Sequence, residues 1–391
     1  MRIADVCAFY TPHGGGVRTY VERKLAAGAA LGQEIVIIAP SARDGVEERP
    51  DGGRIIHVSA PRFPLDRRYR YFADAAAVHV ALDRVRPDVV EASSPWRSAR
   101  FVAEWRGEAP RALVMHADPL AAYAYRWFGG IADRVTIDRC FESFWRHLRR
   151  LGAGFDVIVC ASHHLARRLS NGGVAGVVSV RMGVEPGIFS PARRDEELRR
   201  GLLERCALGA SADLLIGVGR HGPEKRWPMI VDAYEAASVH RPIGLVLIGE
   251  GRASVALARR VAGNPHIRLL APIRDRTAFA SLLASCDALV HGCEAETFGL
   301  AAAEAVASGL PIVVPDEGGA ADLAAPGCSE VYRPADAHAA TAAIRRLLAL
   351  DRVAVGEAAR RAATGARTLD THFAELFDVY SGFVSASSVA A

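Results

Sequence analysis

Short apolar runs alternate with helix-like stretches from one end of the chain to the other, and this alternation restricts the fold more than any other feature. Residues 3–9, 34–38, 89–92 and 157–160 have the length and the β-branched content of buried strands. Stretches between them, such as residues 17–31, space their apolar side chains as helices do. Because strand–helix–strand repetition builds a parallel sheet covered by helices on both faces, we expect an α/β, doubly wound fold.

The repetition starts again after Gly183, with strand-like runs at residues 214–218 and 311–314. A chain of 391 residues is long enough for two domains of ordinary size. We therefore expect one Rossmann-like domain over residues 1–182 and a second over residues 183–369.

Residues 182–192 contain two prolines and two glycines and are the expected hinge between these domains. Residues 370–391 are expected to form a C-terminal helix with a short tail, because their aromatic side chains follow one helical stripe. The stripe allows the helix to pack on the second domain or to cross back to the first. Ligands of doubly wound sheets bind outside the carboxyl ends of the strands, so two such domains facing each other would form a cleft.

Composition excludes several classes of protein. No apolar run is long enough to cross a membrane, and the first residues resemble a β-strand rather than a signal peptide. The seven cysteines include no Cys-x-x-Cys pair, which favours a reducing cytoplasm and argues against a structural zinc site. Residues 1–185 carry 26 Arg and Lys against 20 Asp and Glu, whereas the rest of the chain carries 22 against 24. A basic first half suits an anionic lipid surface, an acidic acceptor or a surface that contacts only water.

Lysine is rare in this chain. Of the 48 basic residues only Lys24 and Lys225 are lysine, and all others are arginine. A lysine in such a chain indicates a position that requires a compact, flexible ammonium. The alternative is that either lysine is present by chance.

Two glutamates flank the expected start of a helix in the second half. Glu296 lies just before Phe298 and Gly299, and Glu304 lies about one and a half turns into the helix. Free backbone N–H groups at a helix start bind phosphate or hydroxyl oxygens, and carboxylates accept hydrogen bonds from sugar hydroxyls. The alternative is a helix-dipole acid followed by an ordinary helix glutamate.

The spacing of Glu296 and Glu304, with Phe298-Gly299 after the first and Ala305 after the second, resembles the Glu-x7-Glu motif of retaining GT-B glycosyltransferases, above all those of family 4. That family includes sucrose synthases and bacterial mannosyl- and glucosyltransferases. The resemblance implies that Glu296 contacts the donor sugar and Glu304 the ribose. It also implies that backbone amides around Phe298, Gly299 and Leu300 hold sugar or phosphate oxygens.

A glycine-rich loop at residues 217–225 also matches the family and carries Arg220 and Lys225. The resemblance implies that these two cations neutralise the diphosphate of the donor as it leaves. A strand-to-helix turn with solvated charges is the alternative. The chain has no Asp-x-Asp and no cluster of acidic and His residues at ligand spacing, so we expect neither a bound metal nor another cofactor.

Family resemblance assigns three further positions to the donor site. Gly15 and Gly16 belong to a glycine turn expected near the donor phosphates, and His116 ends a strand beside the donor sugar. Arg274 is expected to help bind the base. Two acids have unassigned roles, namely Asp118 beside His116 and Asp322, which stands where the family often has Glu.

Two segments of the first half interleave arginine with aromatic residues, at residues 62–72 and 139–151. In related enzymes with lipid-linked acceptors such surfaces rest on the membrane. We therefore expect a cytoplasmic protein with a peripheral contact at the inner face of the membrane, unless the aromatic side chains are core and the arginines merely solvated. The modest net charge and the absence of a known module argue against nucleic acid.

The expected function is that of a retaining hexosyltransferase. It would move a hexose from a UDP- or GDP-linked sugar to a glycan or lipid-linked acceptor in cell-surface polysaccharide or glycolipid assembly. A sugar-nucleotide epimerase on the same fold and a non-catalytic nucleotide-sugar-binding protein remain the alternatives. A phosphorylase is poorly supported because it needs a pyridoxal-bearing lysine, and a dehydrogenase because the dinucleotide fingerprint is missing.

Overall fold

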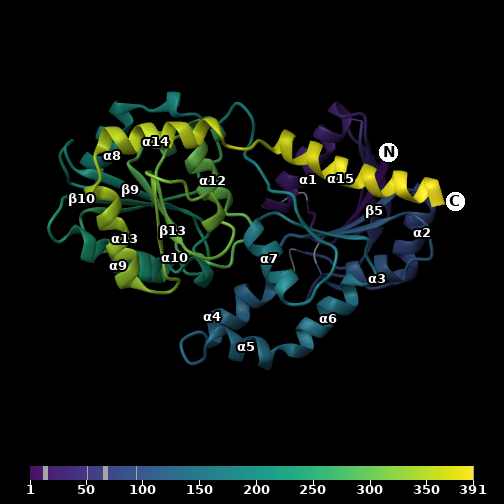
Figure 1. Cartoon of the computed structure of the whole chain (residues 1–391). Helices are drawn as coiled ribbons and strands as arrows, with labels where there is room; N and C mark the ends of the chain where they lie inside the picture. The colour runs from purple at the N-terminus through teal and green to yellow at the C-terminus, as the bar shows by residue number, and fades with distance from the viewer. Residues whose placement is uncertain (12–15, 51, 65–68, 94, 391) are drawn as a thin grey trace. The chain divides into compact units, whose positions relative to one another are not determined.

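The computed structural model describes residues 1–11, 16–50, 52–64, 69–93 and 95–390 (Figure 1). The chain divides into two compact units. Unit 1 comprises residues 1–118, 127–181 and 369–391, and unit 2 comprises residues 119–126 and 182–368. The chain thus passes between the units at 181/182 and at 368/369, close to the expected boundaries, whereas the grouping of residues 119–126 with unit 2 has no counterpart in the sequence prediction.

Unit 1 is built on an eight-stranded sheet in the order β3-β4-β2-β1-β5-β6-β7-β8. All neighbouring strands run parallel except β3, which pairs antiparallel with β4. The strands are β1 (Arg2–Cys7), β2 (Glu34–Ser41), β3 (Gly45–Glu48), β4 (Arg54–Ser59), β5 (Val89–Ser93), β6 (Arg111–Met115), β7 (Val157–Cys160) and β8 (Val177–Ser179).

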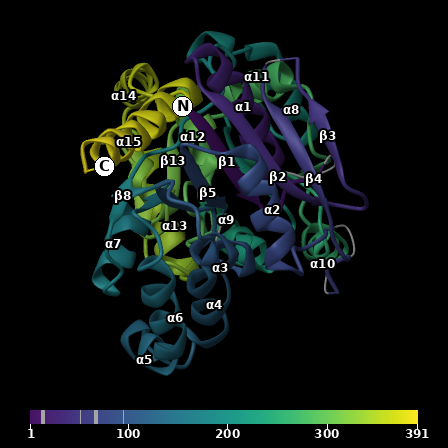
Figure 2. The same cartoon turned by 90° about the vertical axis from the view of Figure 1, so that its right-hand side faces the viewer.

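The helices of unit 1 are α1 (Gly16–Ala30), α2 (Ala75–Val85), α3 (Arg97–Glu104), α5 (Arg134–Cys140), α6 (Glu142–Gly152), α7 (His163–Asn171) and α15 (Leu369–Ala390), and α4 (Tyr125–Phe128) begins in unit 2. Side-chain caps fix several helix starts. Asp74 accepts a hydrogen bond from the Ala76 N–H at 3.0 Å, which satisfies one of the free donors of α2. Figures 1 and 2 both show α15 lying along α1, so the C-terminal segment packs on the sheet formed by the first half.

Unit 2 is built on a six-stranded, fully parallel sheet in the order β11-β10-β9-β12-β13-β14. The strands are β9 (Asp213–Val218), β10 (Ile243–Ile248), β11 (Ile267–Leu270), β12 (Ala288–Val290), β13 (Ile312–Pro315) and β14 (Ser329–Tyr332). The helices are α8 (Glu196–Arg205), α9 (Trp227–Ser238), α10 (Ser254–Val261), α11 (Arg276–Ser285), α12 (Leu300–Ala307), α13 (Ala337–Ala349) and α14 (Arg352–Thr364).

The central strands are continuous apolar runs because both faces of a parallel sheet are covered. All six residues of β10 are buried. One core cluster joins β9 and β10 to α9, α10 and α13 through residues such as Leu245, Ile230 and Ile344. The predicted α/β class with two doubly wound parallel sheets is therefore confirmed.

Unit 1 contains a buried ionic cluster that links its sheet to α1 and α15. Lys24 of α1 is fully buried, and its Nζ donates to Asp5 Oδ2 at 3.0 Å and to Glu91 Oε2 at 2.5 Å. Tyr380 of α15 donates to the same Glu91 oxygen at 2.6 Å. Burial raises the pKa of Glu91 to about 7, although Lys24 opposes the rise. The cluster gives Lys24 a structural role, and it joins the last helix to β5.

Replacing the ammonium at the centre of this cluster is predicted to destabilise unit 1. Lys24→Met leaves Asp5 and Glu91 buried without a cation, which costs about 3–5 kcal/mol of unfolding free energy. Tyr380→Phe removes one hydrogen bond to a charged acceptor and costs about 1.5–3 kcal/mol. Urea unfolding of both variants measures the two effects, and a Lys24→Met variant as stable as the parent would contradict the assigned role.

Candidate active site

Two loops of unit 2 leave neighbouring strands at the point where the strand order reverses. β9 and β12 lie side by side in the sheet, and the chain continues from β9 to β10 on one side and from β12 to β13 on the other. Ligands of doubly wound sheets bind at this position, outside the carboxyl ends of the strands. The β9 loop, residues 219–226, carries Arg220 and Lys225, and the β12 loop, residues 291–299, carries Glu296.

Lys225 and Glu296 form an ion pair between these two loops. Their side chains are 13% and 18% exposed, so the pair is sheltered but reachable from solvent. Burial disfavours the ionised form of Glu296, yet Lys225 and more distant cations outweigh it and hold the pKa of that carboxyl below its ordinary value. Glu296 also raises the pKa of Lys225 against the effect of burial. Both groups are therefore charged at neutral pH.

His291 is a third member of this site that sequence reasoning missed. It follows β12 directly, and its Nε2 lies 3.6 Å from Glu296 Oε1. Burial lowers the pKa of His291 to about 4, so the imidazole is neutral. Tyr332 donates a hydrogen bond to the His291 carbonyl at 2.5 Å and fixes the start of the loop. A polar residue directly after a buried strand was the available signal.

Glycines allow these loops to pack closely. Gly219 has a φ of 152°, and a Cβ on it would lie 2.9 Å from Lys225 Cε. A Cβ on Gly319 would lie 2.5 Å from the backbone of Phe298. The Gly319 N–H also donates to the Glu296 carbonyl at 2.7 Å. The glycines therefore hold the chain around Lys225 and Glu296 in place.

The start of α12 offers free backbone donors beside Glu296. Gly299 precedes the helix with a φ of 87°, a left-handed conformation that favours glycine. Among the residues that the structure describes, none accepts a hydrogen bond from the N–H of Phe298, Gly299 or Leu300. Such donors, together with the helix dipole, attract anionic oxygens.

Glu304 forms an ion pair with Arg276, a residue that the sequence analysis did not assign to the site. Glu304 is 4% exposed, and burial raises its pKa although Arg276 opposes the rise with an ion pair. Arg276 also donates to Glu185 at 3.3 Å and lies 4.9 Å from the Phe189 ring centroid. Arg274 is exposed in the loop before α11. Helix α11 begins after Asp275, and this start turns Arg276 rather than Arg274 toward Glu304.

Arg220 extends into solvent at the rim of the same loop. Its side chain is 81% exposed and lies 3.2 Å from Glu224. Its carbonyl accepts a hydrogen bond from Trp227 Nε1 at 2.9 Å, which fixes the backbone while the guanidinium stays accessible. Arg220 also contributes to the lowered pKa of Glu296.

The other residues that the sequence singles out lie outside these two loops. His116 lies in unit 1, where its ring packs edge-on against Tyr20 at 4.9 Å between centroids, and burial lowers its pKa to about 4. Asp118 pairs with Arg168, and Asp322 lies in a 3-10 turn of unit 2. Gly16 begins α1, whereas Gly15 falls outside the described residues.

Within the described residues, one group of side chains has the types and spacing to hold a metal ion, which the sequence pattern did not indicate. Ligand atoms of His291, Cys293 and Glu296 lie within 4.8 Å of one another. The ammonium of Lys225 already contacts Glu296, so a positive charge occupies the carboxylate that such an ion would use.

The basic, aromatic segment at residues 139–151 is in part core rather than surface. Trp145 of α6 is buried, its indole N–H donates to Asp138 at 3.1 Å, and Arg149 pairs with Glu142. Exposed apolar side chains gather instead between α4 and α5, where Trp127 is 60% and Ile131 is 84% exposed. None of the helices in the described part of the chain is both long and apolar enough to span a bilayer.

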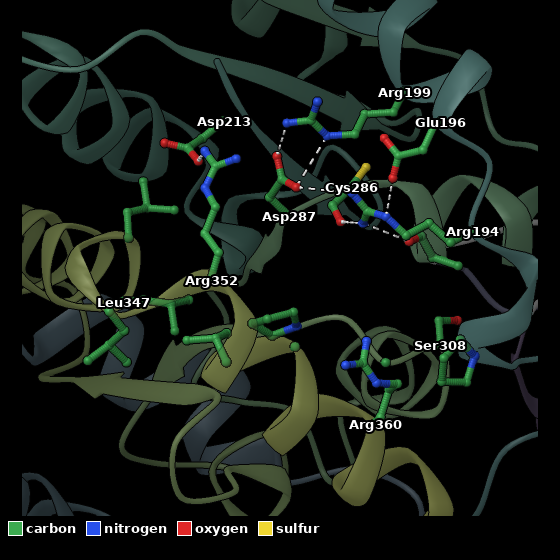
Figure 3. A pocket seen from close by; sticks show the side chains of 18 of the residues that line it. Arg194, Glu196, Arg199, Asp213, Cys286, Asp287, Ser308, Leu347, Arg352 and Arg360 are labelled. Carbon is green, nitrogen blue, oxygen red and sulfur yellow. Dashed lines mark hydrogen bonds and ion pairs between the residues drawn. The ribbon is translucent and has the colours of Figure 1, made fainter. Parts of the chain in front are cut away.

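Unit 2 also has a cavity of about 790 Å³ at the opposite ends of its strands. Figure 3 shows the charged side chains that line it, of which Arg194, Arg199 and Arg352 pair with acids. Arg199 donates to Asp287 at 2.7 Å, and Arg352 pairs with Asp213. Asp213 begins β9 and Asp287 precedes β12, so this cavity lies at the amino ends, away from Lys225 and Glu296. The two ion pairs connect helices α8 and α14 to the amino ends of the strands.

Two family models match the two halves of the chain. The model for glycosyltransferase family 4 matches residues 14–188, and the model for glycosyl transferases group 1 matches residues 212–350. A GDP-mannose-dependent alpha-(1-6)-phosphatidylinositol dimannoside mannosyltransferase of Mycobacterium tuberculosis is 31% identical over 316 residues, which cover 80% of this chain and 79% of the relative. A GDP-mannose-dependent alpha-mannosyltransferase of Mycolicibacterium smegmatis is 29% identical over 404 residues, covering both chains completely.

Solved structures share the same architecture. The sucrose-phosphate synthase of Thermosynechococcus elongatus superposes with a TM-score of 0.77 at 19% identity, covering 98% of this chain and 99% of the other. Two doubly wound parallel sheets with this likeness define a GT-B glycosyltransferase fold. Within that class, the chain belongs to glycosyltransferase family 4, as the sequence motifs predicted.

The pairing of Glu304 predicts different effects for two neighbouring arginines. Arg276→Ala leaves a buried carboxylate without its cation and lowers the free energy of unfolding by about 3 kcal/mol. Arg274→Ala is a matched control at an exposed position and changes it by less than about 0.5 kcal/mol. Chemical denaturation of both variants measures the difference. Equal stability of the two would mean that Arg276 does not neutralise Glu304 in solution.

Proposed function

We propose that this glycosyltransferase transfers mannose from GDP-mannose to a glycolipid acceptor with retention of the anomeric configuration and without a metal ion. The observation that carries the proposal is the Lys225–Glu296 pair at the strand switch point of unit 2. The choice of donor rests on the relatives, since two of them, at 31% and 29% identity, are named as GDP-mannose-dependent mannosyltransferases.

In this proposal the donor replaces the contact between Lys225 and Glu296. The ammonium turns to the diphosphate, with Arg220 beside it, and stabilises the charge that develops as the sugar–phosphate bond breaks. Glu296 then accepts hydrogen bonds from the hydroxyls of the mannose. The free N–H groups of Phe298, Gly299 and Leu300 bind the remaining oxygens.

The other residues have supporting roles in the proposal. Glu304, neutralised by Arg276, binds the ribose of the nucleotide, while Arg274 contacts the base from the exposed loop before α11. By family resemblance we assign His116 to the sugar of the donor, and Gly15 and Gly16 to its phosphates. Two cationic side chains replace the divalent ion that would otherwise neutralise a leaving diphosphate.

Donor turnover tests this proposal directly. The purified chain is expected to release GDP from GDP-mannose, faster than UDP from UDP-glucose or UDP-galactose, and equally in the presence of EDTA. Lys225→Ala and Glu296→Ala are each expected to lower kcat/KM by about 100-fold or more, the usual loss for one preorganised electrostatic group. Glu330→Ala, at a position on β14 far along the sheet, serves as the control. Full activity in Lys225→Ala would refute the assignment.

An acceptor bound to lipid requires access to a membrane surface. We propose that residues 127–135 of unit 1 provide it, because Trp127, Ile131 and Val135 are all exposed there. Arg139 of α5 and Arg146 of α6 are exposed close by in the chain and suit anionic headgroups. Figures 1 and 2 both show α5 and α6 at an outer end of unit 1.

Vesicle binding is expected to depend on these apolar side chains. Trp127→Glu and Ile131→Glu should each reduce co-sedimentation with vesicles that contain phosphatidylglycerol, because a charged side chain opposes insertion at the interface. Val239→Glu, which changes an equally exposed apolar residue of unit 2, is the matched control. Equal binding of all three variants would contradict a membrane contact at residues 127–135.

A further inference from the structure

A second ion pair joins the same two loops through two contacts rather than one. Arg226 follows Lys225, and its Nε donates to Glu294 Oε2 at 2.9 Å while its Nη2 contacts Oε1. The Glu294 side chain is 5% exposed and that of Arg226 is 19% exposed. A two-pronged arginine–carboxylate contact fixes both distance and direction, which a single ammonium contact does not.

The backbone at Arg226 indicates that its side chain is required. Arg226 has a φ of 50° and a ψ of 36°, a left-handed conformation that glycine adopts far more readily than other residues. Its carbonyl accepts the Ile230 N–H at 3.1 Å and begins α9. Glycine would satisfy this backbone without strain. The arginine therefore supplies something that the turn itself does not need.

The two pairs are in register along the loops. Lys225 pairs with Glu296, and the next residue, Arg226, pairs with Glu294, two residues before Glu296. The loops also touch through backbone, since a Cβ on Gly292 would lie 2.5 Å from the Lys225 carbonyl oxygen. Any movement of Arg226 away from Glu294 therefore displaces Lys225 relative to Glu296.

We propose that Arg226 and Glu294 are positioning residues that hold Lys225 and Glu296 in reach of each other and of the donor. The inference rests on the proposed function, in which Lys225 must exchange Glu296 for a diphosphate during each turnover. The pair that exchanges is held by a single ammonium contact, whereas the two-pronged pair between Arg226 and Glu294 persists and keeps the loops together. Displacing a catalytic group by about 1 Å lowers the rate by about 100-fold, so the positioning contact has a measurable effect.

The scarcity of lysine allows a test that needs no substrate. Lys24 is fully buried, so Lys225 is the accessible lysine of the described chain, and its rate of acylation by acetic anhydride, with acetate as the leaving group, can be followed by peptide mass spectrometry. Arg226→Gly keeps the left-handed backbone and removes only the pair. The acylation rate of Lys225 is expected to rise by about tenfold, because Glu296 no longer raises the pKa of the ammonium once it moves away.

Two further variants separate positioning from general loss of stability. Arg226→Gly combined with Glu294→Gln removes the unpaired buried carboxylate, and it is expected to regain thermal stability but to keep the raised acylation rate. Ala207→Gly is the matched control, because Ala207 occupies another left-handed position of unit 2 with a φ of 54°. It is expected to leave acylation of Lys225 unchanged.

Turnover of GDP-mannose completes the test. Both Arg226→Gly and the double variant should lose about 10–100-fold in kcat with a smaller change in KM for the donor. Unchanged acylation of Lys225 in both variants would overturn the positioning role, whether or not the parent enzyme is active. Absence of turnover in the parent, with acylation raised in the variants, would instead refute the proposed function alone.

Discussion

The ion pair between Lys225 and Glu296 depends on the order of strands in unit 2, and the candidate active site is built around this pair. β9 and β12 are far apart in sequence but adjacent in the sheet, and the chain leaves them in opposite directions. Their loops therefore meet at one edge, and a cation from one can reach a carboxylate from the other. Close packing at Gly219 and Gly319 holds these loops in place, and the Arg226–Glu294 pair joins them by a second contact.

Unit 1 uses buried charge for a different purpose. Lys24, Asp5 and Glu91 are fully enclosed, so their contacts join secondary-structure elements rather than meet a ligand. Tyr380 extends this network to α15, and the chain thus returns to its first sheet after completing the second. The two lysines of the chain therefore differ in role. Lys24 lies in the buried core of unit 1, and Lys225 lies in a site that solvent reaches.

The fold class and the main motif were predictable because both depend on local patterns. Apolar runs of four to eight residues in a strand–helix repetition predict a parallel sheet. The spacing of Glu296 and Glu304 can be read directly from the sequence. β3 was not predictable, since all its residues are exposed and only pairing with β4 defines it. Arg276 was missed because its contact with Glu304 depends on where α11 begins. The Arg226–Glu294 pair was missed because only the tertiary fold shows which acid each cation contacts, although both residues lie in the predicted loops.

The central claim is that the ammonium of Lys225 exchanges a carboxylate for a diphosphate. Because the chain has two lysines, protein labelled with 15N-lysine gives two side-chain signals, and that of Lys24 is shielded in the core of unit 1. Titration with GDP should shift the Lys225 ammonium signal to saturation and leave the Lys24 signal in place. A Lys225 signal that stays unchanged while GDP binding saturates, as measured by calorimetry, would contradict the account.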